Sequence, residues 1–175
     1  MTGALAGPRP PVTITVYGVP APQGSKSGFA VKKGGSFTGA VAMKESSAKK
    51  LKPWRQAVLA AGLAAMTDPW LDGECRTPLD GPLEARVVFT FGRPRSHYRT
   101  GRNAHLIRDS APARPAVYPD ASKALRAVED SLVDAGVIRD DCRIVEYSRL
   151  AKVYAGEDPE ALHVPGAVIT VRQLP

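Results

Sequence analysis

Three aspartates flank one amphipathic segment in the last third of the chain. Asp120 follows Pro119 at the start of this segment, and Asp140 and Asp141 follow its end. Carboxylates are ligands that Mg²⁺ prefers, and a divalent ion held against a phosphate diester promotes its hydrolysis. The alternative is that Asp120 only caps a helix and that Asp140 and Asp141 only form a turn. A helix of about 15 residues is roughly 22 Å long, so its ends meet only if the next strand folds back or a second subunit supplies one end.

Basic residues are concentrated ahead of this segment. Residues 1–118 carry 17 Lys and Arg against 7 Asp and Glu, whereas residues 119–175 carry 7 against 10, which gives net charges of +10 and −3. A basic surface attracts the DNA backbone, and carboxylates hold a metal against the scissile phosphate. The division favours a nuclease, and the alternative is a solvated surface with uneven charge.

Residues 18–40 are predicted to form a long loop. This loop contains Gln23-Gly24-Ser25-Lys26 and Lys32-Lys33-Gly34-Gly35, where small residues let backbone amides and lysines approach an anion. A phosphate-contacting loop and an ordinary hairpin both fit this pattern. The motif Gly-x-x-x-x-Gly-Lys-Ser/Thr is absent, which argues against a nucleotide-using enzyme.

A second predicted loop, the arginine-rich loop, spans residues 92–118. It holds six arginines, and only Asp109 opposes them within the loop. Arginines suit phosphate contacts, and the interleaved His and Tyr suit base stacking. From the two loops we take these candidate DNA-binding residues: Lys26, Lys32, Lys33, Arg93, Arg95, His97, Tyr98, Arg99 and Arg102.

Hydrophobic periodicity predicts the elements that position these residues. The predicted order is strand, helix, strand, helix, strand, strand, at residues 12–17, 46–66, 83–91, 120–135, 144–154 and 166–172. Pro53 is expected to start the continuous part of the first helix, because its ring fits a first helical turn. Gly136 is expected to stop the second helix. This pattern predicts an α+β fold, a small mixed sheet packed with two main helices.

The chain has 175 residues, of which 43% are apolar and 23% are charged, and this composition is typical of one globular domain. We expect a flexible lead-in over residues 1–11 and a single domain over residues 12–175. No apolar run approaches the roughly 18 residues of a membrane span, and the N-terminus lacks the features of a signal peptide. We therefore expect a cytoplasmic protein with no membrane contact. Cys75 and Cys142 match no metal or redox spacing and are expected to be free thiols.

The segment from Pro119 to Leu132, followed by Ala135-Gly136-Val137-Ile138-Arg139-Asp140-Asp141 and a valine-containing strand, resembles the motif of the RusA family of Holliday junction resolvases. That motif has Pro-Asp-x-Asp-Asn/Lys-Leu-x-Lys/Arg, an Asp-Ala-Leu further along the helix, and an Asp-Asp before a strand. Residues 21–26, 52–55 and 93–98 also look like the longer, phage-borne members. The resemblance covers about residues 12–172.

The resemblance implies a RusA-like fold and a homodimeric, Mg²⁺-dependent endonuclease of DNA recombination and repair. Such an enzyme binds four-way DNA junctions and nicks two opposed strands, and Mn²⁺ is expected to substitute for Mg²⁺. Asp120 and Asp141 correspond to metal-binding aspartates, and Asp140 joins the metal site as the neighbour that supports a ligand or forms the turn. Arg126 corresponds to a cation that neutralises the phosphate or the developing oxyanion, and Lys123 occupies the Asn/Lys position.

Ser122 departs from the motif, because the family has its second aspartate at this position. A neutral hydroxyl attracts Mg²⁺ much less than a carboxylate does. The sequence therefore predicts Mg²⁺-dependent paired nicking of four-way junctions. The alternative is a protein that binds junctions or other branched DNA with weak or no nuclease activity. A sequence-specific regulator is disfavoured, because no helix-turn-helix is visible.

Overall fold

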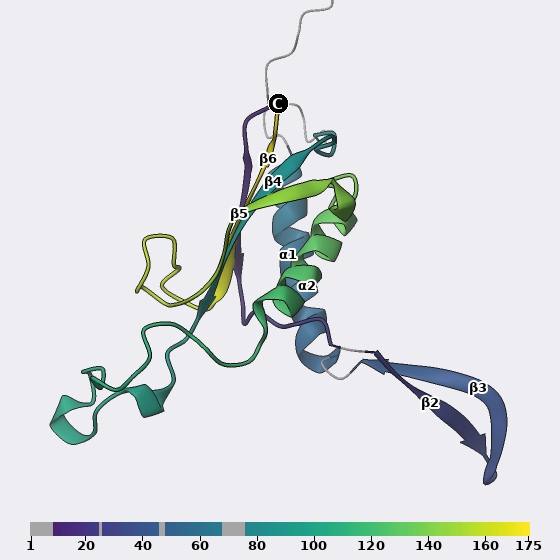
Figure 1. Cartoon of the computed structure of the whole chain (residues 1–175), viewed down its shortest axis with the longest axis horizontal. Coiled ribbons are helices and arrows are strands. Elements are labelled where there is room, and N and C mark those ends of the chain that lie inside the picture. Colours follow the sequence, from purple (N-terminus) through teal and green to yellow (C-terminus); the bar gives the residue numbers. More distant parts are fainter. Residues whose placement is uncertain (1–8, 25, 46–47, 68–75) are drawn as a thin grey trace, which may run out of the picture.

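The computed structural model describes residues 9–24, 26–45, 48–67 and 76–175 of the chain. Its main sheet has the strand order β1-β6-β4-β5, with β1 at Val12–Tyr17, β6 at Gly166–Gln173, β4 at Leu83–Phe91 and β5 at Ile144–Tyr154. Strand β6 pairs antiparallel with β1 and β4, and β4 pairs parallel with β5. Helices α1 (Ala48–Met66) and α2 (Ala121–Asp134) cover one face of the sheet (Figure 1). This mixed sheet with two helices confirms the predicted α+β class.

The pairing pattern fixes which loops lie at which edge of the sheet. Because β1 and β4 are both antiparallel to β6 and β5 is parallel to β4, strands β1, β4 and β5 all end at the same edge. Helix α2 begins at this edge and returns the chain to the start of β5 at the opposite edge (Figure 1). Residues just before α2 and residues just before β5 are therefore far apart within one chain.

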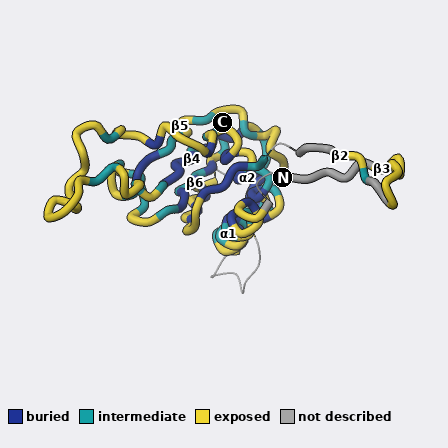
Figure 2. The backbone as a smooth tube through the Cα atoms, turned by 90° about the horizontal axis from the view of Figure 1, so that it is seen from below, coloured by how far each residue is buried: buried dark blue, intermediate teal, exposed yellow. Residues whose placement is uncertain are grey.

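The hydrophobic core lies between the sheet and the two helices (Figure 2). The central strand β4 contributes Leu83, Val87 and Phe89, which are at most 1% exposed. Helix α2 contributes the predicted apolar stripe, in which Val128 and Leu132 are also at most 1% exposed. Side chains on alternate positions of a strand share one face, and side chains three to four apart share one helix face. The predicted stripes of β4 and α2 are confirmed for this reason.

The other face of β4 is covered by the connection 155–165 between β5 and β6. The Leu162 N–H donates to Thr90 Oγ1 at 3.0 Å. Arg149 of β5 binds the carboxylates of Asp158 and Glu160. Hydrogen bonds from arginines hold the pKa of both carboxyls below their usual range, led by Arg149 for Asp158. Both groups are therefore charged at neutral pH, and the connection is clamped to the sheet.

The predicted long loop over residues 18–40 is wrong, because most of it belongs to a hairpin. Strands β2 (Lys26–Lys33) and β3 (Ser36–Glu45) pair antiparallel as a separate two-stranded sheet. Gly34 and Gly35 connect them with φ values of +61° and +85°. A two-residue hairpin turn of this kind needs positive φ at both central positions, which glycine adopts without strain. The structure thus shows a hairpin at Lys32-Lys33-Gly34-Gly35, and phosphate contact by its lysines stays a prediction.

The predicted start of α1 at Pro53 is also wrong. Helix α1 already begins at Ala48 and contains Pro53. Proline lacks the N–H that would bond to the carbonyl of Lys49, but Lys49 is exposed, so water can satisfy that carbonyl. The helix therefore tolerates a proline close to its start.

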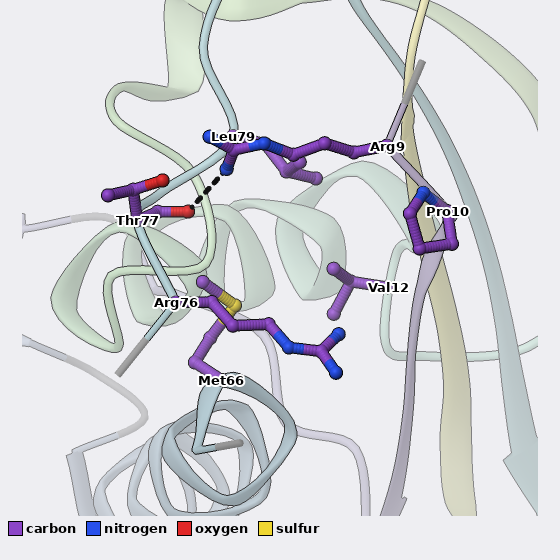
Figure 3. Close-up of a pocket in the computed structure, with 7 residues that line it drawn as sticks. All are labelled: Arg9, Pro10, Val12, Met66, Arg76, Thr77 and Leu79. Atoms are coloured by element: carbon purple, nitrogen blue, oxygen red, sulfur yellow. Dashed lines mark hydrogen bonds between the residues drawn. The ribbon is translucent and has the colours of Figure 1, made fainter. Parts of the chain in front are cut away.

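The predicted lead-in lies mostly outside the described residues, which begin at Arg9. The Arg9 guanidinium donates to the Thr77 carbonyl at 2.9 Å, across a pocket of about 310 Å³ that Val12 and Met66 also line (Figure 3). This contact ties the residues just before β1 to the segment that leads into β4. Cys75 lies outside the described residues, and Cys142 is a free, exposed thiol as predicted.

Gly166 should tolerate no side chain, because two elements meet at its Cα. A Cβ at Gly166 would lie 2.2 Å from the Val16 carbonyl oxygen and 2.7 Å from Leu162 Cδ1. We expect Gly166→Ala to lower the free energy of unfolding in urea by about 3 kcal/mol through overpacking. Gly92→Ala is the matched control, since its Cβ would meet only Pro165 Cγ at 3.8 Å. Equal losses in the two variants would contradict this account.

Candidate metal centre and DNA-binding surface

Asp120 immediately precedes α2, and its carbonyl accepts the N–H of Ala124 at 3.0 Å. The alternative that Asp120 only caps the helix is wrong, because the carboxylate makes no capping hydrogen bond. Asp120 Oδ2 instead lies 3.3 Å from Lys123 Nζ, and 59% of the Asp120 side chain is exposed. The carboxylate is therefore accessible to a cation at the start of α2.

The other predicted ligands follow the end of α2. The helix stops at Gly136 as predicted, with φ of +66°. Asp140 Oδ1 accepts the backbone N–H of Cys142 at 2.9 Å, and hydrogen bonds from Cys142 hold the pKa of Asp140 below its usual range. Asp141 begins the short 3₁₀ turn Asp141–Arg143 and is exposed. Asp140 thus forms the turn, and both carboxylates are exposed.

A single chain does not bring Asp120 and Asp141, which lie at opposite ends of α2, close together. Helix α2 has 14 residues and is therefore about 21 Å long. Asp120 lies at its start, and Asp141 follows its end. Strand β5 runs back beside α2, but it starts after Asp141 and so leaves Asp141 at the far edge of the sheet. In the described part of the chain, no group of three or more His, Cys, Asp or Glu side chains is placed to hold a metal ion.

The end of β5 supports the start of α2. Lys152 Nζ donates to the carbonyl of Val117 at 2.5 Å and to the carbonyl of Pro119 at 2.8 Å. These carbonyls belong to the residues that lead directly into Asp120. Further along α2, the Glu129 carboxylate accepts a hydrogen bond from the Tyr147 hydroxyl of β5. Burial together with this bond raises the pKa of Tyr147. Glu129 is therefore already engaged, and Lys152 fixes the backbone from which Asp120 projects.

The predicted cations and Ser122 lie on the first two turns of α2. Ser122, Lys123 and Arg126 are all exposed. The Lys123 carbonyl also accepts the N–H of Gln23 at 2.9 Å, which ties the connection after β1 to α2. Arg126 has no ion pair among the described residues. The start of α2 thus presents one carboxylate, one hydroxyl and two cations to solvent.

Arg93 holds the arginine-rich loop against the sheet. Its side chain is 4% exposed and binds the carboxylate of Glu157. It also donates to the Pro112 carbonyl at 3.0 Å and lies 4.0 Å from the centre of the Tyr154 ring. His97 packs edge-on against the same ring, at 5.8 Å between ring centres. The Arg93 side chain is therefore buried and His97 is half-buried, and both contact Tyr154 at the base of the loop.

The prediction that only Asp109 opposes the arginines of this loop is incomplete. Arg99 does bind Asp109, at 3.1 Å to each carboxylate oxygen. Arg114 binds Asp158 at 3.0 Å, and Glu157 binds Arg93. Two further carboxylates thus come from the connection 155–165. They neutralise part of the positive charge that the sequence assigns to the loop.

The remaining predicted DNA contacts in this loop differ in exposure. Arg95 and Arg102 lie in the 3₁₀ turns Arg95–His97 and Gly101–Asn103 and are exposed. Neither has an ion pair among the described residues. Tyr98 is half-buried and pairs with Ile107 through an isolated bridge. Arg95 and Arg102 are therefore available to an external anion, whereas Arg108, which is also exposed, donates to the Tyr98 carbonyl at 2.7 Å.

Lys26, Lys32 and Lys33 lie on β2, and their side chains fall outside the part of the molecule that the structure describes. Figure 1 shows the β2–β3 hairpin and the arginine-rich loop projecting from the end of the molecule at which α2 begins, on opposite sides. We call them the two arms. Both follow strands, β1 and β4, that end at this edge.

The contacts made by Lys152, Glu157 and Asp158 were not predicted from the sequence. Lys152 is 35 and 33 residues away from its two carbonyl partners, and Glu157 is 64 residues away from Arg93. No local motif marks such pairs. One signal was available in the sequence, the excess of arginines in a loop that folds onto a compact domain. Such an excess indicates that carboxylates from elsewhere in the chain pair with some of these arginines.

These features define a class of protein. A basic α+β domain presents a carboxylate and two cations at a helix start, between two projecting arms. This arrangement suits a protein that acts on a phosphate backbone. No helix in the described part of the chain is long and apolar enough to cross a membrane.

The model of the family described as endodeoxyribonuclease RusA matches residues 36–164. The chain therefore belongs to the RusA family, a family of endodeoxyribonucleases that resolve Holliday junctions. The match confirms the family that the motif around Asp120 predicts. No curated protein matches the chain.

Proposed function

We propose that this protein is a homodimer that binds four-way DNA junctions and nicks two opposed strands with Mg²⁺ or Mn²⁺. We further propose that each metal site combines Asp120 of one subunit with Asp141 of the partner subunit. The observation that carries this proposal is the separation of two exposed carboxylates by the full length of α2. Carboxylates suit Mg²⁺, and a two-fold axis brings such separated ends together twice in one dimer.

The two arms supply the DNA contacts in this proposal. Arg95 and Arg102 bind phosphates from the arginine-rich loop, and Lys26, Lys32 and Lys33 bind them from the hairpin. Arg93, His97 and Arg99 keep the loop in shape through Tyr154, Glu157 and Asp109. Because a four-way junction has two-fold symmetry, the two copies of this surface in a dimer contact two equivalent pairs of DNA duplexes.

The chemistry follows from the residues at the start of α2. When bound, a divalent ion polarises the phosphate and activates a water for in-line attack. Lys123 orients the Asp120 carboxylate, and Arg126, two turns into α2, balances the charge that develops on the phosphate oxygens. Lys152 holds the backbone ahead of Asp120. Ser122 leaves this set one carboxylate short of the family motif.

Ser122 also supports a second candidate function, a junction-binding protein with weak or no cleavage. Metal affinity falls when a carboxylate ligand is replaced by a hydroxyl. The arms do not depend on the metal, so binding would persist without it.

Labelled four-way junctions distinguish the two functions. An active resolvase should produce symmetric nicks in Mg²⁺ or Mn²⁺ and none in EDTA, whereas binding should be similar in both and should weaken with salt. Binding without nicks at any metal concentration would leave the second function. Equal affinity for four-way junctions and linear duplex of the same length would contradict both.

Lys152 provides a test of how Asp120 is positioned. Lys152→Met keeps the length of the side chain but leaves the carbonyls of Val117 and Pro119 without their donor. We expect cleavage to fall about 10- to 100-fold, as for groups that orient a metal ligand, with junction affinity and dimer mass unchanged. Lys152→Arg should recover much of the rate. A parallel loss of junction affinity, or equal rates in the two variants, would contradict a positioning role.

A further inference from the structure

A groove opens directly beside the start of α2. It has a volume of about 730 Å³ and lies between the end of β1, the first turns of α1 and the residues ahead of Asp120. Tyr17, Trp54, Phe91 and Tyr118 supply aromatic walls, and Lys49 and Lys50 line it from α1. Its size falls within the range of about 300–1,000 Å³ that is typical of small-ligand sites and suits a nucleotide.

The groove has the surface properties of an interaction site. Tyr17, Val19 and Tyr118 are 64%, 67% and 65% exposed and all line it. Large apolar side chains gathered on one patch mark a binding surface, whereas single ones do not. Beneath them Trp54 is 2% exposed, and its Nε1 has no hydrogen-bond partner among the described residues. The floor of the groove is therefore formed before any ligand arrives.

The charge of the groove identifies its occupant. Lys49 and Lys50 are exposed, and none of the described residues that line the groove is acidic. Aromatic faces combined with cations suit a nucleotide, whose base stacks while its phosphate meets the ammonium groups. The groove also ends at Pro119, the residue before Asp120, so a nucleotide bound there is continuous with DNA whose phosphate lies at Asp120.

We propose that this groove binds one unpaired nucleotide of the junction, taken from the crossing point next to the phosphate at Asp120. The proposal rests on the proposed function, because it takes the junction as the substrate. A base at the point where strands exchange costs less to unstack than one inside a duplex. Tyr17 and Tyr118 stack on the base, and Lys49 and Lys50 bind its flanking phosphates.

A double-mutant cycle between protein and DNA tests this. Junction affinity is measured in EDTA for the wild-type protein and Tyr17→Ala, on an intact junction and on junctions with one abasic nucleotide at each position flanking the crossing point. Removing the ring should weaken binding to the intact junction about 5- to 150-fold, which corresponds to one base stacked on an aromatic side chain. At one abasic position, the wild-type protein should lose junction affinity by the same factor as Tyr17→Ala loses on the intact junction. At this position Tyr17→Ala should lose no further affinity.

Controls separate the groove from the rest of the surface. Tyr17 is exposed at the end of β1, so Tyr17→Ala should fold, and its urea transition verifies this. Lys50→Gln should weaken binding and reduce its salt dependence, yet keep the coupling between Tyr17 and the base. Val164→Ala, at an apolar side chain that is 49% exposed and does not line the groove, should change nothing.

Three results would overturn the inference. Losses that multiply at every abasic position would show that Tyr17 does not touch a base. A fall of Tyr17→Ala from dimer to monomer in light scattering would show that a second copy of the chain covers the groove. If the wild-type protein nicks junctions but shows no coupling between Tyr17 and any base, this inference alone is overturned. If the wild-type protein shows no preference for junctions, the proposed function is overturned as well.

Discussion

An equal mixture of Asp120→Asn and Asp141→Asn subunits should nick four-way junctions, although each variant alone should be inactive. In a mixed dimer, one site combines Asp120 of the second variant with Asp141 of the first and is intact, and the other site has lost both carboxylates. Random pairing makes half of the dimers mixed, so about a quarter of the wild-type number of sites should be restored. Gel analysis of junctions with each strand labelled in turn measures this.

The structure makes both substitutions suitable for the test. Asp120 makes no capping hydrogen bond, and its ion pair with Lys123 is exposed, so Asp120→Asn should cost little stability. Asp141 is exposed in a turn that Asp140 holds. Mixed dimers should cut only one strand per binding event, so they should accumulate singly nicked junctions, which distinguishes them from traces of wild-type dimer.

A control mixture isolates the geometry. Pairing Asp120→Asn with the double variant Asp120→Asn/Asp141→Asn forms the same kind of mixed dimer but leaves no intact site in any arrangement. This mixture should be inactive. If the first mixture is as inactive as this control, while native mass spectrometry of subunits that carry tags of different mass shows that mixed dimers form, each site lies within one subunit and the shared site is excluded.

The elements that the sequence predicted correctly are those with strong periodic patterns. Strand β4 and helix α2 bury nearly every residue of their apolar stripes, and burial is what makes such stripes visible in a sequence. The β2–β3 hairpin stands apart from the core, so its strands carry no comparable stripe. The pair Gly34-Gly35 was its one clear signal, and it also fitted a phosphate-contacting loop.

The candidate site also contains features that could be predicted from the sequence and features that could not. The types and spacing of Asp120, Ser122, Arg126 and Asp141 are local properties, and the family match supports the motif that contains them. The role of Arg93 is not local, because it depends on Glu157, which reaches it only through the β5–β6 connection. An arginine in a predicted loop has the same sequence signal whether it meets a phosphate or a distant carboxylate. Sequence reasoning therefore overestimated the positive charge that the arginine-rich loop leaves without a carboxylate partner.

Ser122→Asp should lower the Mg²⁺ concentration needed for half-maximal nicking. The change restores the second carboxylate of the family motif, two residues after Asp120, at an exposed position in the first turn of α2. A carboxylate at this position suits the positive end of the helix dipole and should not destabilise the fold. We expect a shift of about 10- to 100-fold, comparable to the loss of a group that supports a metal ligand. Metal titrations of junction cleavage measure it.

The control must separate a metal ligand from a simple change of charge. Ala121→Asp adds the same charge one residue earlier on the same helix turn, but on a face rotated by about 100°. It shares the effect on the helix dipole and on the overall field, whereas only position 122 reproduces the family motif. Ser122→Asn adds size without charge and should leave the Mg²⁺ requirement unchanged. If Ser122→Asp and Ala121→Asp respond alike to Mg²⁺, the missing carboxylate does not limit metal binding, because the gain then comes from charge alone.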